Sequence, residues 1–315
     1  MHNHEEADHL QASLANYFGA RSLERAAERR EDHEWLSAKL KDHATRIVPM
    51  QTAQNLFAAD HTPVFFSPHD FPAGLEALQQ AIFLCEEEGA AYFAVDLVEI
   101  PEMAILAQRR GEFGDLKARA ALLPAREAAV LAYARAMLHW QRTHRFCGAC
   151  GTRTHSFSGG HMRQCASSAC GRQLFPRTDP AIIVLVTHGA RTLLARQAKW
   201  PERVFSTLAG FVEPGETLEA AVMREVWEEA GVRLFRIHYH SSQPWPFPAS
   251  IMLGFHAQAL SMDLRLNSAE ISEAAWWTRA ELRAAVQLHQ IKLPTEVSIA
   301  RRLIQDWLDT ETKDT

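Results

Sequence analysis

The segment from Gly210 to Val232, GFVEPGETLEAAVMREVWEEAGV, constrains the fold more than any other part of the chain. Pro214-Gly215 predicts a turn, Thr217 is a candidate N-cap, and Gly231 is typical of the residue that ends a helix. We therefore predict a loop followed by a helix. Its apolar and acidic side chains fall on different arcs, so the two faces of this helix must meet different surroundings.

Three carboxylates of this helix are predicted to converge. On a helical wheel Val222, Val226 and Ala230 share one side. An adjacent arc carries Glu225, Glu228 and Glu229. Arg224 is the only cation close in sequence, so the repulsion among the acids needs another compensator. Mg²⁺ or Mn²⁺ would serve, because these ions take hard oxygen ligands and leave positions for water and for phosphate oxygens. The alternative is a solvated acidic face.

A cluster of cysteines is the second constraint. Two cysteine pairs are separated by fourteen residues that include the turn Ser158-Gly159-Gly160: Cys147, Cys150, Cys165 and Cys170. This spacing predicts a closed tetrahedral zinc site, in which four sulfurs leave no open position for water, so one zinc ion per chain would be structural. Two disulfides are the alternative. Cys85 lies in an apolar run and is predicted to be a core residue.

Apolar patterning divides the 315 residues into predicted domains. The first 45 residues are charged and predicted to be peripheral, whereas the runs PVFF, AIFLC and AYFAVDLVEI between residues 47 and 100 are typical of strands. Pro124 predicts the first turn of a helix, AIIVLV and RTLLARQ predict strands of a mixed α/β unit, and the last helix is predicted over Thr295–Leu308. The predicted domains are 1–123, α+β; 124–143, a connecting helix; 144–175, the zinc ribbon; and 176–315, the α/β catalytic domain.

The loop and helix resemble the Nudix hydrolase family, whose box is G-x5-E-x7-R-E-U-x-E-E-x-G-U with U aliphatic. Every defined position is met: Gly210, Glu216, Arg224, Glu225, Val226, Glu228, Glu229, Gly231 and Val232. The resemblance implies an α/β/α sandwich in which the three glutamates of the acidic arc bind the catalytic metals. It also implies that Arg224 orients a neighbouring glutamate, that Gly210 and Glu216 shape the loop, and that a later loop adds a carboxylate, with Glu270 the first candidate and Glu273 the second.

A proline-rich segment downstream, SQPWPFPAS, points to the substrate. Its prolines fix φ and lower the entropy lost on ordering, so Trp245, Phe247 and the Gln243 amide would be held ready for a flat group such as a nucleobase. A structural loop is the alternative. The segment resembles the signature of the NAD(H) pyrophosphatase branch of the Nudix family, and the four-cysteine ribbon ahead of the catalytic domain matches the same branch.

This second resemblance implies a dinucleotide pocket and a homodimer. Phe175 stands where the branch often has Tyr, which keeps a ring for stacking and loses a phenolic hydrogen bond. The residues expected to bind the substrate are Phe175, Phe211, Gln243, Trp245, Phe247, Ser250, Met252 and Ala300. Five of these residues are expected in the pocket because of the resemblance: Phe211, Gln243, Ser250, Met252 and Ala300. The alternative for each is an ordinary place in the core, and this applies especially to Met252 and Ala300.

The resemblance implies metal-dependent hydrolysis of the pyrophosphate of NAD(H) to NMN(H) and AMP. Water would attack in line at the adenylate phosphorus, with one of the three glutamates accepting its proton. Three alternatives stay open. The enzyme could act on another substrate, which could be ADP-ribose, a dinucleoside polyphosphate or the NAD cap of an RNA. The protein could be a zinc-ribbon regulator that binds nucleic acid and uses its Nudix domain as a ligand sensor, or it could have a purely structural role, which explains neither motif.

Charge and targeting signals limit the partners. The formal net charge of −5 argues against a protein that coats nucleic acids in general. Arg142–Arg177 contains six arginines and no acid, which favours a solvated basic face, with local binding of a polyanion such as RNA as the alternative. The N-terminus has no apolar stretch typical of a secretory signal, and no run of about 18 apolar residues predicts a membrane span. We therefore expect a cytoplasmic protein without a membrane partner.

Overall fold

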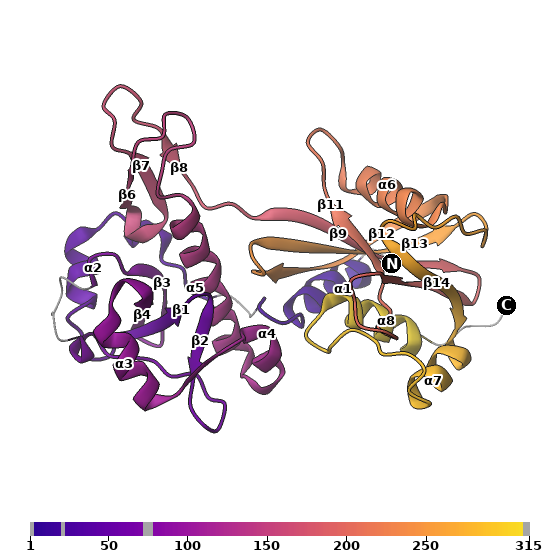
Figure 1. Cartoon of the computed structure of the whole chain (residues 1–315), viewed down its shortest axis with the longest axis horizontal. Helices are drawn as coiled ribbons and strands as arrows, with labels where there is room; N and C mark the ends of the chain where they lie inside the picture. Colours follow the sequence, from indigo (N-terminus) through magenta and orange to yellow (C-terminus); the bar gives the residue numbers. More distant parts are fainter. Residues whose placement is uncertain (1–2, 20–22, 72–77, 311–315) are drawn as a thin grey trace. The chain divides into compact units, whose positions relative to one another are not determined.

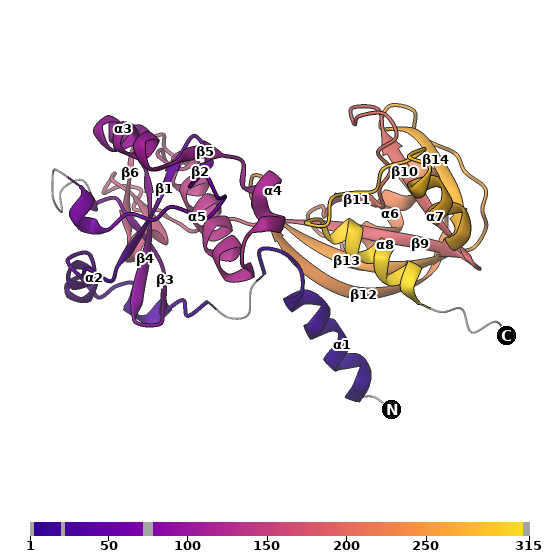
Figure 2. The same ribbon diagram turned by 90° about the horizontal axis from the view of Figure 1, so that it is seen from below.

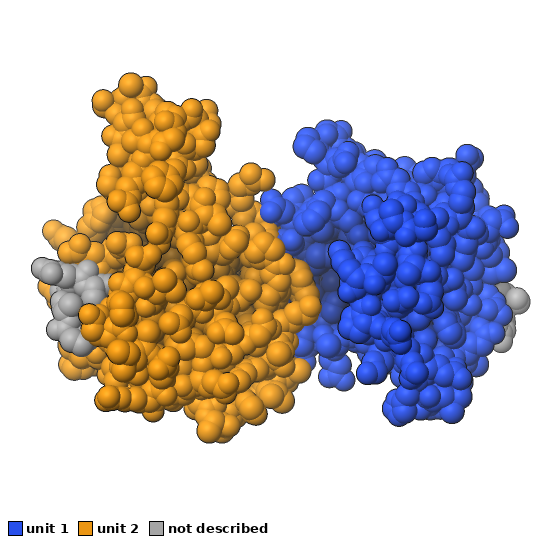
Figure 3. Space-filling model, in the orientation of Figure 1, with its two compact units in different colours: residues 1–19, 179–244, 250–315 blue, residues 20–178, 245–249 orange. Residues whose placement is uncertain are grey.

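The computed structural model describes residues 3–19, 23–71 and 78–310. By their contacts the residues form two compact units, which Figure 3 shows in different colours. Unit 1 comprises residues 1–19, 179–244 and 250–315, and unit 2 comprises residues 20–178 and 245–249. The domain boundaries predicted from the sequence stay a prediction.

Unit 2 is built on a five-stranded sheet of order β3-β4-β1-β2-β5. Its strands are β1 (Arg46–Gln51), β2 (Gln54–Phe57), β3 (Ile82–Glu87), β4 (Ala90–Asp96) and β5 (Glu112–Gly114). The helices around it are α2 (His33–Lys39), α3 (Pro101–Arg110), α4 (Leu116–Arg119) and α5 (Ala125–Thr143), with 3₁₀ turns at Ala27–Arg29, Pro68–Asp70, Leu97–Glu99 and Ala120–Leu122. β1 pairs in parallel with β4 and antiparallel with β2.

Two of the strand predictions for this region are confirmed and one is wrong. All of AIFLC after its first residue lies in β3 and the first six residues of AYFAVDLVEI lie in β4, and Phe83 and Phe93 of these strands are buried in the core. The rest of the second run is not strand, because Leu97–Glu99 form a 3₁₀ turn that the Asp96 side chain caps. PVFF makes only isolated bridges, at Pro63 and Phe66. The run passes from Phe57 of β2 to Ile47 of β1, so it bridges each strand at one residue and does not pair with either over successive residues.

The zinc ribbon is a small sheet that follows α5 (Figure 1). Its strands are β6 (Thr154–Phe157), β7 (Met162–Cys165) and β8 (Gln173–Leu174), with a 3₁₀ turn at Ser158–Gly160. This turn packs on β3, where a Cβ on Gly160 would lie 2.8 Å from Ile82 Cγ2. The buried His161 ring is hydrogen-bonded through Nε2 to the Phe83 carbonyl at 2.7 Å, and burial lowers its pKa to about 4. The ribbon is thereby fixed to the sheet of unit 2.

Unit 1 is built on a six-stranded sheet of order β12-β13-β9-β10-β14, with β11 paired to β9. The strands are β9 (Asp179–His188), β10 (Arg191–Gln197), β11 (Leu208–Phe211), β12 (Leu234–Trp245), β13 (Ser250–Ala259) and β14 (Ile271–Thr278). Its helices are α1 (Asn3–Leu14), α6 (Leu218–Ala230), α7 (Arg279–Gln287) and α8 (Ile299–Asp309). β13 runs parallel to β9, whereas β10 and β11 run antiparallel to it.

The α/β/α sandwich predicted for unit 1 is confirmed. Successive side chains of a strand face opposite sides of a sheet. On β9, Ile182 and Val184 pack in a core with α6, whereas Ile183 and Leu185 pack in a second core with α7 and α8. Figure 2 shows α6 and α8 on opposite faces of the strands. The uninterrupted apolar run AIIVLV is therefore explained by burial on both faces.

The last helix begins later than the sequence pattern predicts. The predicted start is Thr295, but α8 starts at Ile299 because the hydroxyl of Ser298 accepts a hydrogen bond from the Ala300 amide at 3.2 Å and caps the helix. Over the described part of the chain, none of the helices has the length and apolar character needed to span a bilayer.

Candidate active site

Helix α6 has the ends that its sequence predicts. The Thr217 hydroxyl accepts a hydrogen bond from the Ala220 amide at 3.2 Å, and Gly231, at φ 70°, donates to the Trp227 carbonyl at 2.9 Å. Val222 and Val226 are fully buried against the sheet. This packing fixes the rotation of the helix and thus the direction of the glutamates on the adjacent arc.

The Arg224 guanidinium joins three carboxylates. It donates two hydrogen bonds to Glu216, at 3.1 and 2.6 Å, and one each to Glu225, at 2.9 Å, and Glu228, at 3.1 Å. A further bond at 2.9 Å reaches the Phe211 carbonyl. The guanidinium lowers the pKa of Glu216, and its three acidic partners raise its own pKa. Arg224 thus ties the loop to the acidic arc of α6.

Gly210 leaves room for a carboxylate to approach strand β11. A Cβ at this position would lie 1.9 Å from Glu225 Cδ and 2.3 Å from Glu225 Oε2. Only a residue without a side chain therefore allows the Glu225 carboxylate to lie against the backbone. This contact gives the first residue of the motif a physical role.

Replacing Gly210 by Ala should lower activity without unfolding the protein. The new methyl group would displace the Glu225 carboxylate, which is the flexible end of its side chain, so the fold can adjust while the ligand geometry is lost. A displacement of about 1 Å can cost roughly a hundredfold in rate. We expect a loss of that size in kcat with an almost unchanged melting temperature. Wild-type kcat in the variant would contradict the assigned role of Gly210.

Glu229 carries the clearest sign of a missing cation. Its side chain is buried, at 2 % exposure, and its Oε2 atom has no hydrogen-bond partner. Burial raises its pKa to about 8, and the nearby charges of Glu225 and Glu270 add to this effect. A buried carboxylate oxygen without a donor is costly unless a cation binds it. The donor set of hard oxygens fits Mg²⁺ or Mn²⁺.

The three glutamates of the acidic arc of α6 differ in how far their side chains are exposed to solvent. The side chain of Glu225 is 13 % exposed and that of Glu228 is 53 % exposed. Among the described residues, only the cysteine cluster already has all its ligand atoms within 4.8 Å of one another; the glutamates are not gathered that closely. Instead, Glu225 and Glu228 share the Arg224 guanidinium.

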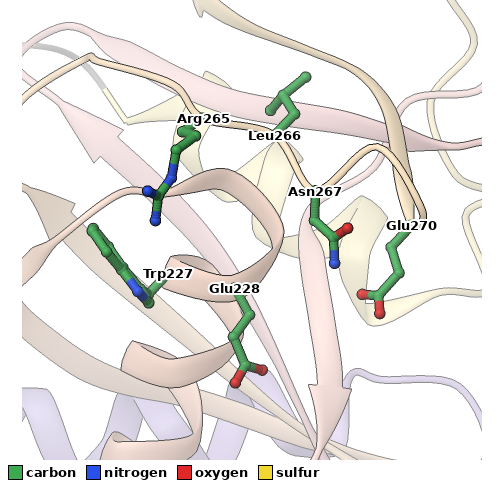
Figure 4. A pocket seen from close by; sticks show the side chains of 6 residues that line it. All are labelled: Trp227, Glu228, Arg265, Leu266, Asn267 and Glu270. Carbon is green, nitrogen blue, oxygen red and sulfur yellow. The ribbon is translucent and has the colours of Figure 1, made fainter.

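The structure separates the two candidates for the additional carboxylate. Glu270 and Glu228 line one pocket of about 510 Å³ (Figure 4). The backbone N–H of Asn267 donates a hydrogen bond to the Glu229 carbonyl at 3.0 Å, and this bond fixes the loop that carries Glu270 beside α6. Glu273 is held in an ion pair with Arg196, with 2.6 Å between the charged atoms. This geometry favours Glu270.

The four cysteines have the geometry of a structural zinc site. All their sulfurs lie within 4.8 Å of one another, with 3.8 Å between Cys147 and Cys170 and 3.4 Å between Cys150 and Cys165. Zn–S bonds of 2.3 Å in a tetrahedron require sulfur separations of about 3.8 Å. None of the cysteines is in a disulfide. The zinc ribbon is thus confirmed, and so is the burial of Cys85.

Gln243 is not placed as the substrate prediction requires. It is fully buried, its amide nitrogen donates to the Tyr17 and Val297 carbonyls, at 3.1 and 2.8 Å, and its amide oxygen accepts from Ile299 at 2.8 Å. Both amide hydrogens and one of the two acceptor positions of the oxygen are therefore used inside unit 1, and the side chain has no exposed surface to offer a base. Ala300 lies in the core and Met252 packs against it, whereas Phe175 and Phe211 are each 60 % exposed.

Arg135, which the sequence patterns did not single out, holds the proline-rich loop. It is half-buried on α5, donates through Nε to the Pro246 carbonyl at 2.8 Å and through Nη1 to the Ala53 carbonyl, and its guanidinium lies 4.8 Å from the centre of the Phe247 ring. Burial lowers the pKa of Arg135. Trp245 and Phe247 meet edge to face at 5.1 Å. The available signal was an arginine between the apolar residues Ala134 and Met137 of α5.

Replacing Arg135 by Ala should loosen this loop. Both carbonyls would lose their donor and the Phe247 ring would lose its cation contact, so amide exchange across residues 245–249 should become about tenfold faster, as expected for the loss of about 1.4 kcal/mol. Hydrogen-exchange mass spectrometry measures this directly. Arg145→Ala, which removes an exposed ion pair with Glu99 just beyond the end of the same helix, is the control. Equal exchange in both variants would rule out the restraint by Arg135.

Three known domain families match successive parts of this chain. Residues 177–299 match the NUDIX domain family, residues 142–175 match the NADH pyrophosphatase zinc ribbon domain, and residues 44–140 match the NADH pyrophosphatase-like rudimentary NUDIX domain. The three matches follow one another along the chain.

Curated relatives match over most of this chain. The NAD-capped RNA hydrolase NudC of Deinococcus radiodurans is 40% identical, covering 76% of this chain and 82% of that protein, and NudC of Mycobacterium bovis is 38% identical, covering 74% and 76%. Nudix hydrolase 19, chloroplastic, of Arabidopsis thaliana is 37% identical, covering 68% of this chain and 52% of that protein. The chain thus spans about half the length of the plant relative.

Proposed function

The chain belongs to the Nudix hydrolases of the zinc-ribbon NADH pyrophosphatase type, and from this premise we propose that it hydrolyses the pyrophosphate bond of NAD(H) to NMN(H) and AMP. The observation that supports the proposal best is the unpartnered, buried Glu229 oxygen beside Glu225 and Arg224. Such an arrangement is suited to divalent cations, and divalent cations are what a pyrophosphate needs for its charge to be neutralised during hydrolysis.

The proposed mechanism assigns a task to each side chain of the site. Bound Mg²⁺ or Mn²⁺ would neutralise the pyrophosphate charge and acidify a water molecule. Glu225, Glu228 and Glu229 would hold the cations, with Glu270 as the candidate fourth carboxylate. One of the three α6 glutamates accepts the proton of the attacking water. Arg224 keeps Glu225 oriented while its paired bonds to Glu216 fix the loop.

The proposed substrate contacts are the exposed or half-buried members of the predicted set. Trp245 and Phe247 offer rings for a flat base, as do Phe175 and Phe211. Ser250 and Met252 stay candidates for the pocket wall. Gln243 and Ala300 are instead assigned to the support of that wall, because their burial leaves them no access to a ligand. We further propose a homodimer in the cytoplasm.

NAD-capped RNA is the second candidate substrate, because the NudC relatives are named NAD-capped RNA hydrolases. The segment Arg142–Arg177 offers less free charge to an RNA than its six arginines suggest. Arg142 and Arg145 form ion pairs with Asp96 and Glu99, and Arg163 is hydrogen-bonded to Thr154. Arg153 and Arg172 stay exposed for phosphate contacts.

Incubation of the purified protein with NADH and either Mg²⁺ or Mn²⁺ tests the proposal. We expect NMNH and AMP, and no products when EDTA is added. Parallel reactions with ADP-ribose, a dinucleoside polyphosphate and NAD-capped RNA rank the substrates, and an RNA chain held by phosphate contacts should lose affinity as salt rises. No metal-dependent AMP from NADH would reject the proposed function, and the regulator alternative would then gain support.

A further inference from the structure

The pocket beside the α6 carboxylates has a second, basic side. Figure 4 shows Glu228 and Glu270 together with the Arg265 guanidinium next to the Trp227 ring and with the Asn267 amide. Besides Glu270, three residues that line the pocket belong to neither the Nudix box nor the proline-rich signature: Arg265, Leu266 and Asn267. The pocket therefore joins the proposed metal-binding acids to side chains that have no role in holding metal.

Main-chain contacts fix this basic side on the end of α6. The backbone N–H of Arg265 donates to the Ala230 carbonyl at 2.8 Å, and the backbone N–H of Asn267 donates to the Glu229 carbonyl at 3.0 Å. Gly231, at φ 70°, allows the approach, because a Cβ there would lie 2.7 Å from Arg265 Cβ. The last carbonyls of α6, which have no hydrogen-bond donor within the helix, thus hold residues 265–267 in place.

The polar groups on the basic side of the pocket include hydrogen-bond donors that the protein leaves available. Arg265 lies 5.1 Å from the centre of the Trp227 ring and Arg233 lies 5.2 Å from it. Within the described part of the chain Arg265 has no ion pair. The side-chain oxygen of Asn267 accepts a hydrogen bond from the Ala269 backbone N–H at 3.2 Å, so its side-chain nitrogen is the group that remains available to a ligand as a donor. An aromatic ring holds a guanidinium in place without neutralising it. The pocket therefore presents positive charge and amide donors.

This donor set fits a phosphate group. Guanidinium and amide N–H groups bind phosphate oxygens by charge-assisted hydrogen bonds. Because Glu228 and Glu270 lie at its border, the pocket would repel an anion unless cations were bound on the acidic side. A pyrophosphate substrate would bind with such cations present. An anion in this pocket would therefore arrive together with the metal-bound substrate.

We propose that Arg265 and Asn267, on the platform of Trp227, bind a phosphate group of the nucleotide substrate adjacent to the phosphorus under attack. The inference rests on the proposed function. Two sources supply this chemistry: the other phosphate of the dinucleotide pyrophosphate, or the phosphodiester that continues from the adenosine in a capped RNA. Either makes Arg265 a determinant of substrate affinity.

Arg265→Gln tests the proposal by kinetics with NADH and with a short NAD-capped RNA. Loss of one charged hydrogen bond is expected to lower kcat/KM about tenfold, mainly through KM. An equal loss for both substrates assigns the pocket to the pyrophosphate, and a loss about tenfold larger for the capped RNA assigns it to the phosphodiester. Arg236→Gln is the matched control, because Arg236 is an exposed arginine of β12 whose guanidinium lies near the Phe235 ring instead.

A binding measurement separates this inference from the proposed function. Calorimetric titration with inorganic pyrophosphate and with adenosine 3′,5′-bisphosphate, each with Mg²⁺ present, needs no turnover. Arg265→Gln should bind at least one of these probes about tenfold more weakly than the wild type. Unchanged affinity for both probes, together with kinetics equal to those of Arg236→Gln, would overturn the assignment even if NADH is hydrolysed normally.

Discussion

Replacing Glu229 by Gln is expected to lower kcat for NADH about a thousandfold, within the range seen when a group that handles protons or developing charge is removed. The amide keeps the size of the side chain, so the buried site stays filled. It removes the negative charge of the one α6 acid that has a buried, unpartnered oxygen. The same substitution at Glu228 should also remove most of the activity without unfolding the protein.

Thermal melting distinguishes a lost metal site from a damaged fold. Metal-free Glu229→Gln should melt no lower than the wild type, because an uncompensated buried carboxylate is costly and its pKa is raised. Saturating Mn²⁺ should raise the melting temperature of the wild type but not of the variant. Glu219→Gln, an exposed acid in the first turn of the same helix, serves as control. Turnover by Glu229→Gln within threefold of the control would refute the role of Glu229.

Local sequence signals account for what could be predicted. The caps of α6 follow from side chains within four residues of each end, and its buried face follows from the spacing of Val222, Val226 and Ala230. The cysteine spacing predicts the ribbon because two short loops bring each pair of sulfurs together. In these cases the interaction that decides the structure lies between near neighbours in sequence.

Tertiary contacts decide what could not be predicted. Gln243 has the chemistry of a base-reading side chain, yet Tyr17 and Val297, far away in sequence, occupy its amide. The burial of Glu229 depends on how α6 packs on β11, and a helical wheel places Glu229 and Glu228 on the same arc. Arg265 reaches the site through hydrogen bonds across more than thirty residues, which no spacing pattern records.

Replacing Cys165 by Ser is expected to abolish zinc binding and unfold the ribbon. Cys165 is buried, at 5 % exposure, and three remaining thiolates cannot complete the tetrahedron. Structural zinc supplies about 10 kcal/mol or more of folding free energy in small zinc peptides, and the three short strands of the ribbon have little apolar core to replace it. Metal analysis should show one zinc per wild-type chain and none in the variant. Amide exchange should rise across residues 144–175.

The docking of the ribbon on β3 limits how far this unfolding extends. His161 and Gly160 hold the turn against the sheet, so their contacts should weaken with the ribbon, whereas the core around Phe83 and Phe93 has its own packing and should stay protected. Cys85→Ser is the matched control, because it removes a buried thiol of the same unit outside the cluster and should keep its zinc. If Cys165→Ser retained one zinc and wild-type exchange in the ribbon, the sulfurs would not be the ligands, and the contacts with β3 alone would have to hold this sheet together.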